Sequence, residues 1–113
     1  MQFRRLIVLS VLAHLTGLFT TCFAGDEVYK LVIKDHQFSP VELSIPSGKK
    51  IKLFVENQDS TTEEFESYDL NREKIVPGNG KITLFLGPLR QGIYKYFGEF
   101  HKKSAKGIIK VTN

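Results

Sequence analysis

Apolar residues recur at every second position in short runs along this chain, and turn residues separate the runs. The runs lie at residues 28–35, 41–45, 51–55, 82–86, 93–97 and 107–111. A period of two places successive side chains on opposite faces of an extended strand, so each run is typical of a β-strand. Runs at this spacing predict an all-β fold, a Greek-key β-sandwich of about seven strands.

The segments between the runs contain dense turn signals. Pro46-Ser47-Gly48, Pro77-Gly78-Asn79-Gly80 and Gly87-Pro88 all combine residues that favour turns. The length of 113 residues allows one domain. Residues 58–76 are predicted to form one long irregular segment. Long loops in compact domains often carry function, so we expect the chemistry of the protein there.

The N-terminal residues have the pattern of a targeting segment. Arg4 and Arg5 precede an apolar run over residues 6–19, and a stretch of small residues ends at Ala24. This order is typical of a secretory signal peptide. The run is shorter than the roughly 20 apolar residues of a spanning helix. We therefore predict a signal peptide at residues 1–24 and a mature periplasmic domain at residues 25–113, with no stable membrane insertion after cleavage.

The predicted mature chain contains neither cysteine nor methionine, because Cys22 and Met1 both precede residue 25. Disulfide scaffolds, thiol nucleophiles and cysteine-ligated zinc are excluded on this basis. One alternative stays open. Residues 18–22 loosely resemble a lipid-attachment box, which would leave an acylated Cys22 at the mature N-terminus.

Missing motifs exclude further function classes. The chain has no G-x-S-x-G elbow, no phosphate-binding glycine loop and no H-E-x-x-H pair. Its basic residues concentrate only near the C-terminus, at Lys102, Lys103, Lys106 and Lys110. These lysines lack the interleaved aromatic residues of a base-stacking surface, so we predict no nucleic-acid partner.

The densest group of chemically useful side chains lies in the predicted irregular segment, at Glu63, Glu64 and Glu66. In an extended segment Glu64 and Glu66 point to one side, whereas Glu63 and Phe65 point to the other. Phe65 would anchor the segment inward and bring carboxylates to the end of the sandwich. A solvated acidic loop is the alternative interpretation.

A second group follows the aromatic run, where Glu99 and His101 precede the last predicted strand. A histidine in such a loop is either a metal ligand or an ordinary hydrogen-bonded side chain. His36 lies in a short turn after the first run, and we interpret it as a turn residue.

Three segments together resemble cupredoxin-like domains. Residues 37–48 match the opening pattern F-x-P-x-x-(I/L)-x-(V/I)-P-x-G, and residues 54–57 match the strand that ends in Asn before the first ligand loop. Residues 92–97 match the G-x-Y-x-(F/Y) strand that leads into the copper loop. The segments occur in the family's order, so the resemblance implies a cupredoxin-like sandwich over nearly all of residues 28–113.

Blue copper sites of that family use two His, one Cys thiolate and a weak axial Met. The resemblance places Gly98 at the position of the Cys and His101 at the second His. The first His falls on Glu63 or Glu64, and no Met follows His101. We therefore expect a protein that is not a blue copper electron carrier.

A narrower resemblance is to the EfeO-type domain, the small periplasmic cupredoxin-like component of bacterial oxidase-dependent iron permease systems. Residues 56–57, 63–68, 70–74 and 97–101 carry it. It implies a metal site at Glu63, Glu64, Glu66, Glu99 and His101. Iron or copper(II) is the implied cofactor, and an iron permease and other periplasmic iron-uptake components are the implied partners. Carboxylates with one imidazole suit iron, manganese or copper(II) better than copper(I).

Three functions are open at this point. The first is an accessory of iron uptake that binds the metal, assists oxidation of ferrous iron or delivers it to the permease. The second is a metal-free cupredoxin scaffold that works as an interaction module in the periplasm. The third is a free-standing small oxidase, which the absence of a second metal constellation in the sequence disfavours.

Overall fold

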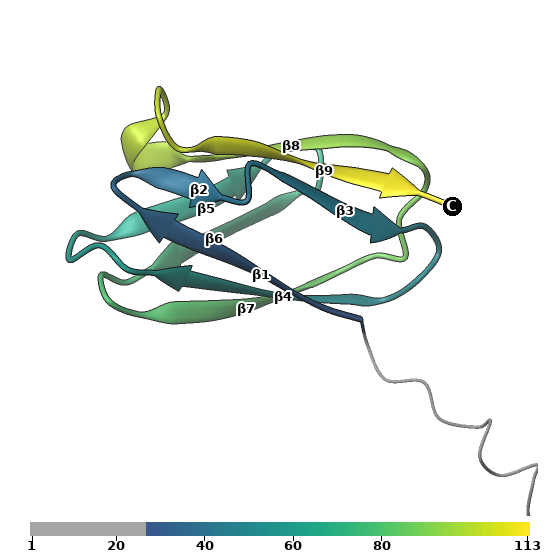
Figure 1. The fold of residues 1–113 in the computed structure, drawn as a ribbon, viewed down its shortest axis with the longest axis horizontal. Coiled ribbons are helices and arrows are strands. Elements are labelled where there is room, and N and C mark those ends of the chain that lie inside the picture. Colours follow the sequence, from purple (N-terminus) through teal and green to yellow (C-terminus); the bar gives the residue numbers. More distant parts are fainter. Residues whose placement is uncertain (1–26) are drawn as a thin grey trace, which may run out of the picture.

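Nine strands and one short helical turn make up residues 27–113, the part of the chain that the computed structural model describes (Figure 1). The strands are β1 (Glu27–Lys34), β2 (Gln37–Ser39), β3 (Glu42–Pro46), β4 (Ile51–Asn57), β5 (Glu63–Ser67), β6 (Arg72–Val76), β7 (Lys81–Leu86), β8 (Gly92–Gly98) and β9 (Lys106–Thr112), and the 3-10 turn is η1 (Glu99–His101). The predicted signal peptide at residues 1–24 lies outside the described residues. No helix within residues 27–113 is long and apolar enough to cross a membrane.

The strands form two mixed sheets that pack face to face, which confirms the predicted sandwich (Figure 1). One sheet has the order β2-β1-β4-β7, and the other has the order β3-β9-β8-β5-β6. β1 pairs with β4 in parallel, and β3 pairs with β9 in parallel. In the five-stranded sheet β5 lies next to β8, although the two are far apart in the sequence. This pairing brings Glu63, Glu64 and Glu66 of β5 close to Glu99 and His101, which follow β8.

An apolar core fills the space between the sheets. Leu31 of β1 and Val55 of β4 are buried, and three aromatic rings lie close to them in the core. The rings of Phe65 and Tyr96 stack with centroids 5.2 Å apart, and the ring of Phe38 meets Tyr96 edge-on at 4.9 Å. Aromatic rings bury a large apolar area each, so this cluster fixes β5 against β8 beside the candidate site.

Residues 58–76 are more regular than the sequence predicts. β5 and β6 form an antiparallel pair within this segment, and β5 also pairs with β8. Buried and half-buried residues alternate along β5, but two of its buried residues, Glu63 and Ser67, are polar. A pattern of apolar residues cannot reveal such a strand. With the three-residue β2, these two strands add three to the six apolar runs, so the described residues form nine strands where about seven were predicted.

Candidate metal site

The start of β5 and the turn η1 meet at one end of the sandwich. Phe65 of β5 pairs with Gly98 of β8, so the chain leaves β8 and enters η1 beside Glu63. The Nδ1 atom of His101 lies 2.7 Å from Oε2 of Glu63. The segments that carry the two groups of candidate residues are therefore adjacent.

Glu63 is buried, and the protein itself supplies its hydrogen-bond partners. Only 1% of the residue is exposed. The backbone N–H groups of Glu64 and Phe100 donate to Oε1 at 3.0 and 2.9 Å, while His101 contacts Oε2. A buried carboxylate is costly unless it is hydrogen-bonded in this way. Glu63 therefore holds η1 against β5, and both of its carboxylate oxygens already have polar partners within the protein.

The place that the resemblance assigns to the copper thiolate has no room for a side chain. A Cβ atom added to Gly98 would lie 2.6 Å from Cδ of Glu63 and 2.8 Å from Cβ of Ala105. The Glu63 carboxylate thus occupies the space between Gly98 and His101. Because a thiolate is missing and a carboxylate fills the space, these residues do not fit a blue copper centre.

A separate group of carboxylates lies on the outer face of the five-stranded sheet. Glu64, Glu66 and Glu99 each direct a carboxylate oxygen into one region, and these oxygens lie within 4.8 Å of one another. All three residues are half-buried. Glu73 of β6 pairs directly with Glu66 and adds a fourth carboxylate to the group. We call Glu64, Glu66, Glu73 and Glu99 the outer carboxylate cluster.

Two members of the outer carboxylate cluster, Glu64 and Glu66, have raised pKa values. Desolvation raises the pKa of Glu64 and of Glu66, and the carboxylate of Glu73 raises both further. A raised carboxyl pKa means that the surroundings disfavour the negative charge. A proton, a metal cation or an ammonium group near these oxygens would relieve that cost.

Glu99 differs from the other members because its two oxygens have different surroundings. Its Oε1 lies 3.3 Å from Nζ of Lys102, in an ion pair across one turn of chain. Its Oε2 is buried and has no hydrogen-bond partner. An unpartnered buried oxygen is uncommon in folded proteins, and a hydrogen-bond donor or a cation would satisfy it.

A pair of stacked imidazoles also lies at this end of the sandwich. The rings of His36 and His101 are 3.6 Å apart and inclined by 11°. Asp59 accepts backbone N–H groups of Asp35 and His36, and its Oδ2 lies 3.5 Å from Nδ1 of His36. Hydrogen bonding from the His36 N–H is the main cause that lowers the pKa of Asp59. His36 lies in the turn between β1 and β2, as predicted, and its ring also stacks on His101, a contact that no spacing signal in the sequence indicates.

The lone pairs of two parallel imidazoles point along their own ring planes. One ion between rings stacked at 3.6 Å would lie far out of both planes, so the stacked pair does not form a shared metal site. The structure therefore separates the sequence-predicted residues into two groups. Glu64, Glu66 and Glu99 converge on the outer face, whereas Glu63 and His101 form a part-buried contact between β5 and η1.

Comparisons with known proteins agree with this fold. The family model of the cupredoxin-like domain matches residues 6–111. An uncharacterized protein of Rickettsia prowazekii (strain Madrid E) is 48% identical over 84 residues, which cover 74% of this chain and 67% of that protein.

Solved structures of copper proteins have a similar fold at low sequence identity. Auracyanin A, a blue copper protein of Chloroflexus aurantiacus, has a TM-score of 0.67 and 12% identity over 78% of this chain and 100% of that chain. The metal-binding domain of the Cu(I)-exporting ATPase CopA of Streptococcus pneumoniae D39 has a TM-score of 0.68 and 10% identity over 82% and 92% of the two chains. At these identities the likeness shows the fold alone. The family match over residues 6–111 establishes that this chain belongs to the cupredoxin-like domain family.

Proposed function

We propose that this protein is a periplasmic metal-binding accessory of bacterial iron uptake, and that it binds a cation at the outer carboxylate cluster. The convergence of Glu64, Glu66 and Glu99 within 4.8 Å is the observation that carries this proposal. The raised pKa values of Glu64 and Glu66 and the unpartnered Oε2 of Glu99 support it, because a cation would relieve both.

The donor set decides the class of metal. Carboxylate oxygens are hard ligands that suit iron and manganese, and they accept copper(II) more readily than copper(I). The copper-protein structures with this fold support copper without distinguishing its oxidation state, while iron rests on the EfeO-type resemblance. Export through a signal peptide at residues 1–24 and a permease as partner rest on the sequence.

Glu63 and His101 have a positioning role in this proposal. Glu63 accepts the backbone N–H of Phe100 and contacts His101, so it holds the turn that carries Glu99 against β5. A residue that orients a ligand without touching the metal affects affinity less directly than the ligand itself. Blue copper electron transfer is not part of the proposal, because the Gly98 position cannot supply a thiolate.

Isothermal titration of the purified protein tests the cation site. Iron(II) under anaerobic conditions and copper(II) are titrated separately at neutral pH. Glu64→Gln and Glu66→Gln should each weaken binding at least ~10-fold, because each removes one anionic ligand. Glu42→Gln is the matched control, since Glu42 is an exposed carboxylate at the start of β3 in the same sheet. Equal affinities in the parent and both cluster variants would exclude the site.

A metal-free interaction module is the second candidate, and the ion pair between Lys102 and Glu99 favours it. In that case lysines of the protein itself compensate part of the cluster's charge. The same titration separates the two candidates, because a metal-free module gives no saturable heat with either ion.

A further inference from the structure

One row of residues crosses the outer face of the five-stranded sheet and changes charge along its length. Phe97 of β8 pairs with Lys106 of β9 on one side and with Glu66 of β5 on the other. Glu66 in turn pairs with Glu73 of β6. Directly paired residues of antiparallel strands share one face, so Lys106, Phe97, Glu66 and Glu73 lie side by side. The row is basic at one end, aromatic in the centre and acidic at the other end.

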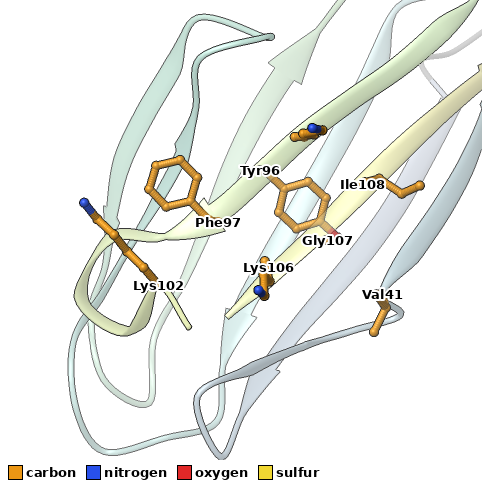
Figure 2. Close-up of a pocket in the computed structure, with 8 residues that line it drawn as sticks. Val41, Tyr96, Phe97, Lys102, Lys106, Gly107 and Ile108 are labelled. Atoms are coloured by element: carbon orange, nitrogen blue, oxygen red, sulfur yellow. The ribbon is translucent and has the colours of Figure 1, made fainter. Parts of the chain in front are cut away.

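A groove lies on the basic side of Phe97, with an apolar lining and lysines around it. Its volume is about 580 Å³, and Val41, Phe97 and Ile108 supply apolar surface (Figure 2). Lys95, Lys102 and Lys106 also line the groove. Within residues 27–113, Lys95 and Lys106 have no carboxylate partner at ion-pair distance, so their charges are uncompensated.

The acidic side of Phe97 carries exposed apolar residues of its own. Tyr68, which follows β5, is 76% exposed, and its ring contacts Phe97 edge-on at 5.5 Å. Ile75 of β6 pairs with Glu64 and is 46% exposed. Each half of the face therefore has apolar side chains, and the two halves have opposite charge.

We propose that a second copy of this chain covers the face in a symmetric dimer. A two-fold axis that lies in the interface along β8 places the β9 side of each copy on the β5 side of the other. Lys106 of one copy then faces Glu66 of the other, and the two Phe97 rings meet at the axis. The exposed Tyr68, which lies on the same side of the row as Lys95 and Ile108, turns toward the groove on the opposite copy.

Charge complementarity favours a second copy over other occupants. An anionic membrane would attract the lysines, but it would repel Glu64, Glu66 and Glu73 on the same face. A purely acidic peptide would fill the groove and leave the outer carboxylate cluster uncompensated. A second copy pairs both halves in one arrangement, and opposite charges across an interface also fix its register.

Sedimentation velocity over a range of protein concentrations tests the dimer, in buffer with a chelator so that no metal contributes. We expect concentration-dependent dimerisation that weakens as salt is raised, because the facing charges are screened. Lys106→Glu and Glu66→Lys should each weaken association at least ~10-fold, since each places like charges opposite one another.

The double variant Lys106→Glu, Glu66→Lys is the decisive protein. It exchanges the two charges that face each other across the axis, so positions 66 and 106 are again complementary and association should return. Lys50→Glu is a matched control, because it makes the same charge change in the turn before β4 and should leave association unchanged. Circular dichroism checks that each variant is folded.

Three outcomes would overturn the dimer. They are a monomer at all concentrations, equal association in all variants, or a monomer that instead binds anionic vesicles or an acidic peptide through Lys106. The dimer and the proposed cation site share Glu66, but Lys106→Glu tests the dimer alone. Lys106 is not part of the outer carboxylate cluster, and the association is measured without metal.

Discussion

The carboxylate of Glu63 lies 2.7 Å from Nδ1 of His101, in the space that the cupredoxin-like resemblance assigns to a copper ion. In this protein a hydrogen-bonded side chain joins β5 to η1 where a metal would join them in a blue copper protein. The end of the sandwich is therefore closed by the chain's own groups. The stability of this end of the sandwich should therefore depend on the Glu63 carboxylate and not on a metal ion bound by a thiolate.

Replacing Glu63 should destabilise the fold. Glu63→Ala leaves the backbone N–H groups of Phe100 and Glu64 without their acceptor, and it removes the contact to His101. Loss of hydrogen bonds to a buried charged group should lower the free energy of unfolding by about 2–3 kcal/mol. Urea denaturation at neutral pH measures the change.

Glu63→Gln is the control for this prediction. The amide has the same shape and retains an oxygen for the two backbone donors, so it should cost clearly less than alanine. If alanine and glutamine have equal effects, the carboxylate oxygens are not what holds η1 in place.

Adding a methyl group at Gly98 should also be destabilising. The new Cβ would lie 2.6 Å from Cδ of Glu63 and 2.8 Å from Cβ of Ala105, so one of the neighbours must move. Overpacking of this kind costs about 1–3 kcal/mol. Because the two sites are in contact, the combined loss in Gly98→Ala, Glu63→Ala should be smaller than the sum of the single losses. Strict additivity in urea denaturation would contradict the packing described here.

Copper(II) should not turn the purified protein blue. The intense absorption of blue copper proteins needs a cysteine thiolate, and residues 27–113 contain no cysteine. Titration with copper(II) at neutral pH, followed by visible absorption, should show only the weak bands of oxygen or nitrogen ligation. An intense blue band that disappears in Cys22→Ser would mean that Cys22 is retained and reaches the metal.

The alternation of apolar residues was sufficient to predict the sandwich and the positions of most strands. It missed β5 because the buried residues of that strand include Glu63 and Ser67, which a hydrophobic period cannot register. The approach of residues 62–67 to residues 98–101 was inferred from the resemblance. Local sequence does not specify which strands become neighbours in a sheet.

The arrangement within the site was less predictable. Glu63 and Glu64 are adjacent in the sequence, yet one is buried against His101 and the other lies on the outer face. The period of a strand predicts that they diverge, and the inward Phe65 indicates the side that is buried, but neither predicts that Glu63 contacts His101. The stacking of His36 on His101 and the contribution of Glu73 depend on tertiary contacts between separate loops and strands. No spacing in the sequence encodes those contacts.

The outer carboxylate cluster should make stability depend on pH in a defined direction. The folded-state pKa values of Glu64 and Glu66 are raised above the ordinary value of 4.5. A group with a raised folded pKa binds its proton more tightly in the folded state. Its stabilising contribution is therefore complete below about pH 4.5 and is lost as the pH rises through the folded pKa.

Glu66→Gln isolates this effect, because the other titrating groups are common to both proteins. Without metal, the variant should unfold at a higher temperature than the parent at pH 7, and the difference should vanish at about pH 3.5, where the carboxyls are protonated in both states.

Adding a divalent cation at pH 7 should raise the unfolding temperature of the parent and should raise that of the variant much less. The reason is that a ligand stabilises the folded state only if the folded protein binds it, and the variant has lost one ligand. Glu42→Gln, which changes an exposed carboxylate outside the cluster, should show neither effect. A variant that is no more stable than the parent at pH 7 would mean that the four carboxylates do not repel one another enough to favour a cation.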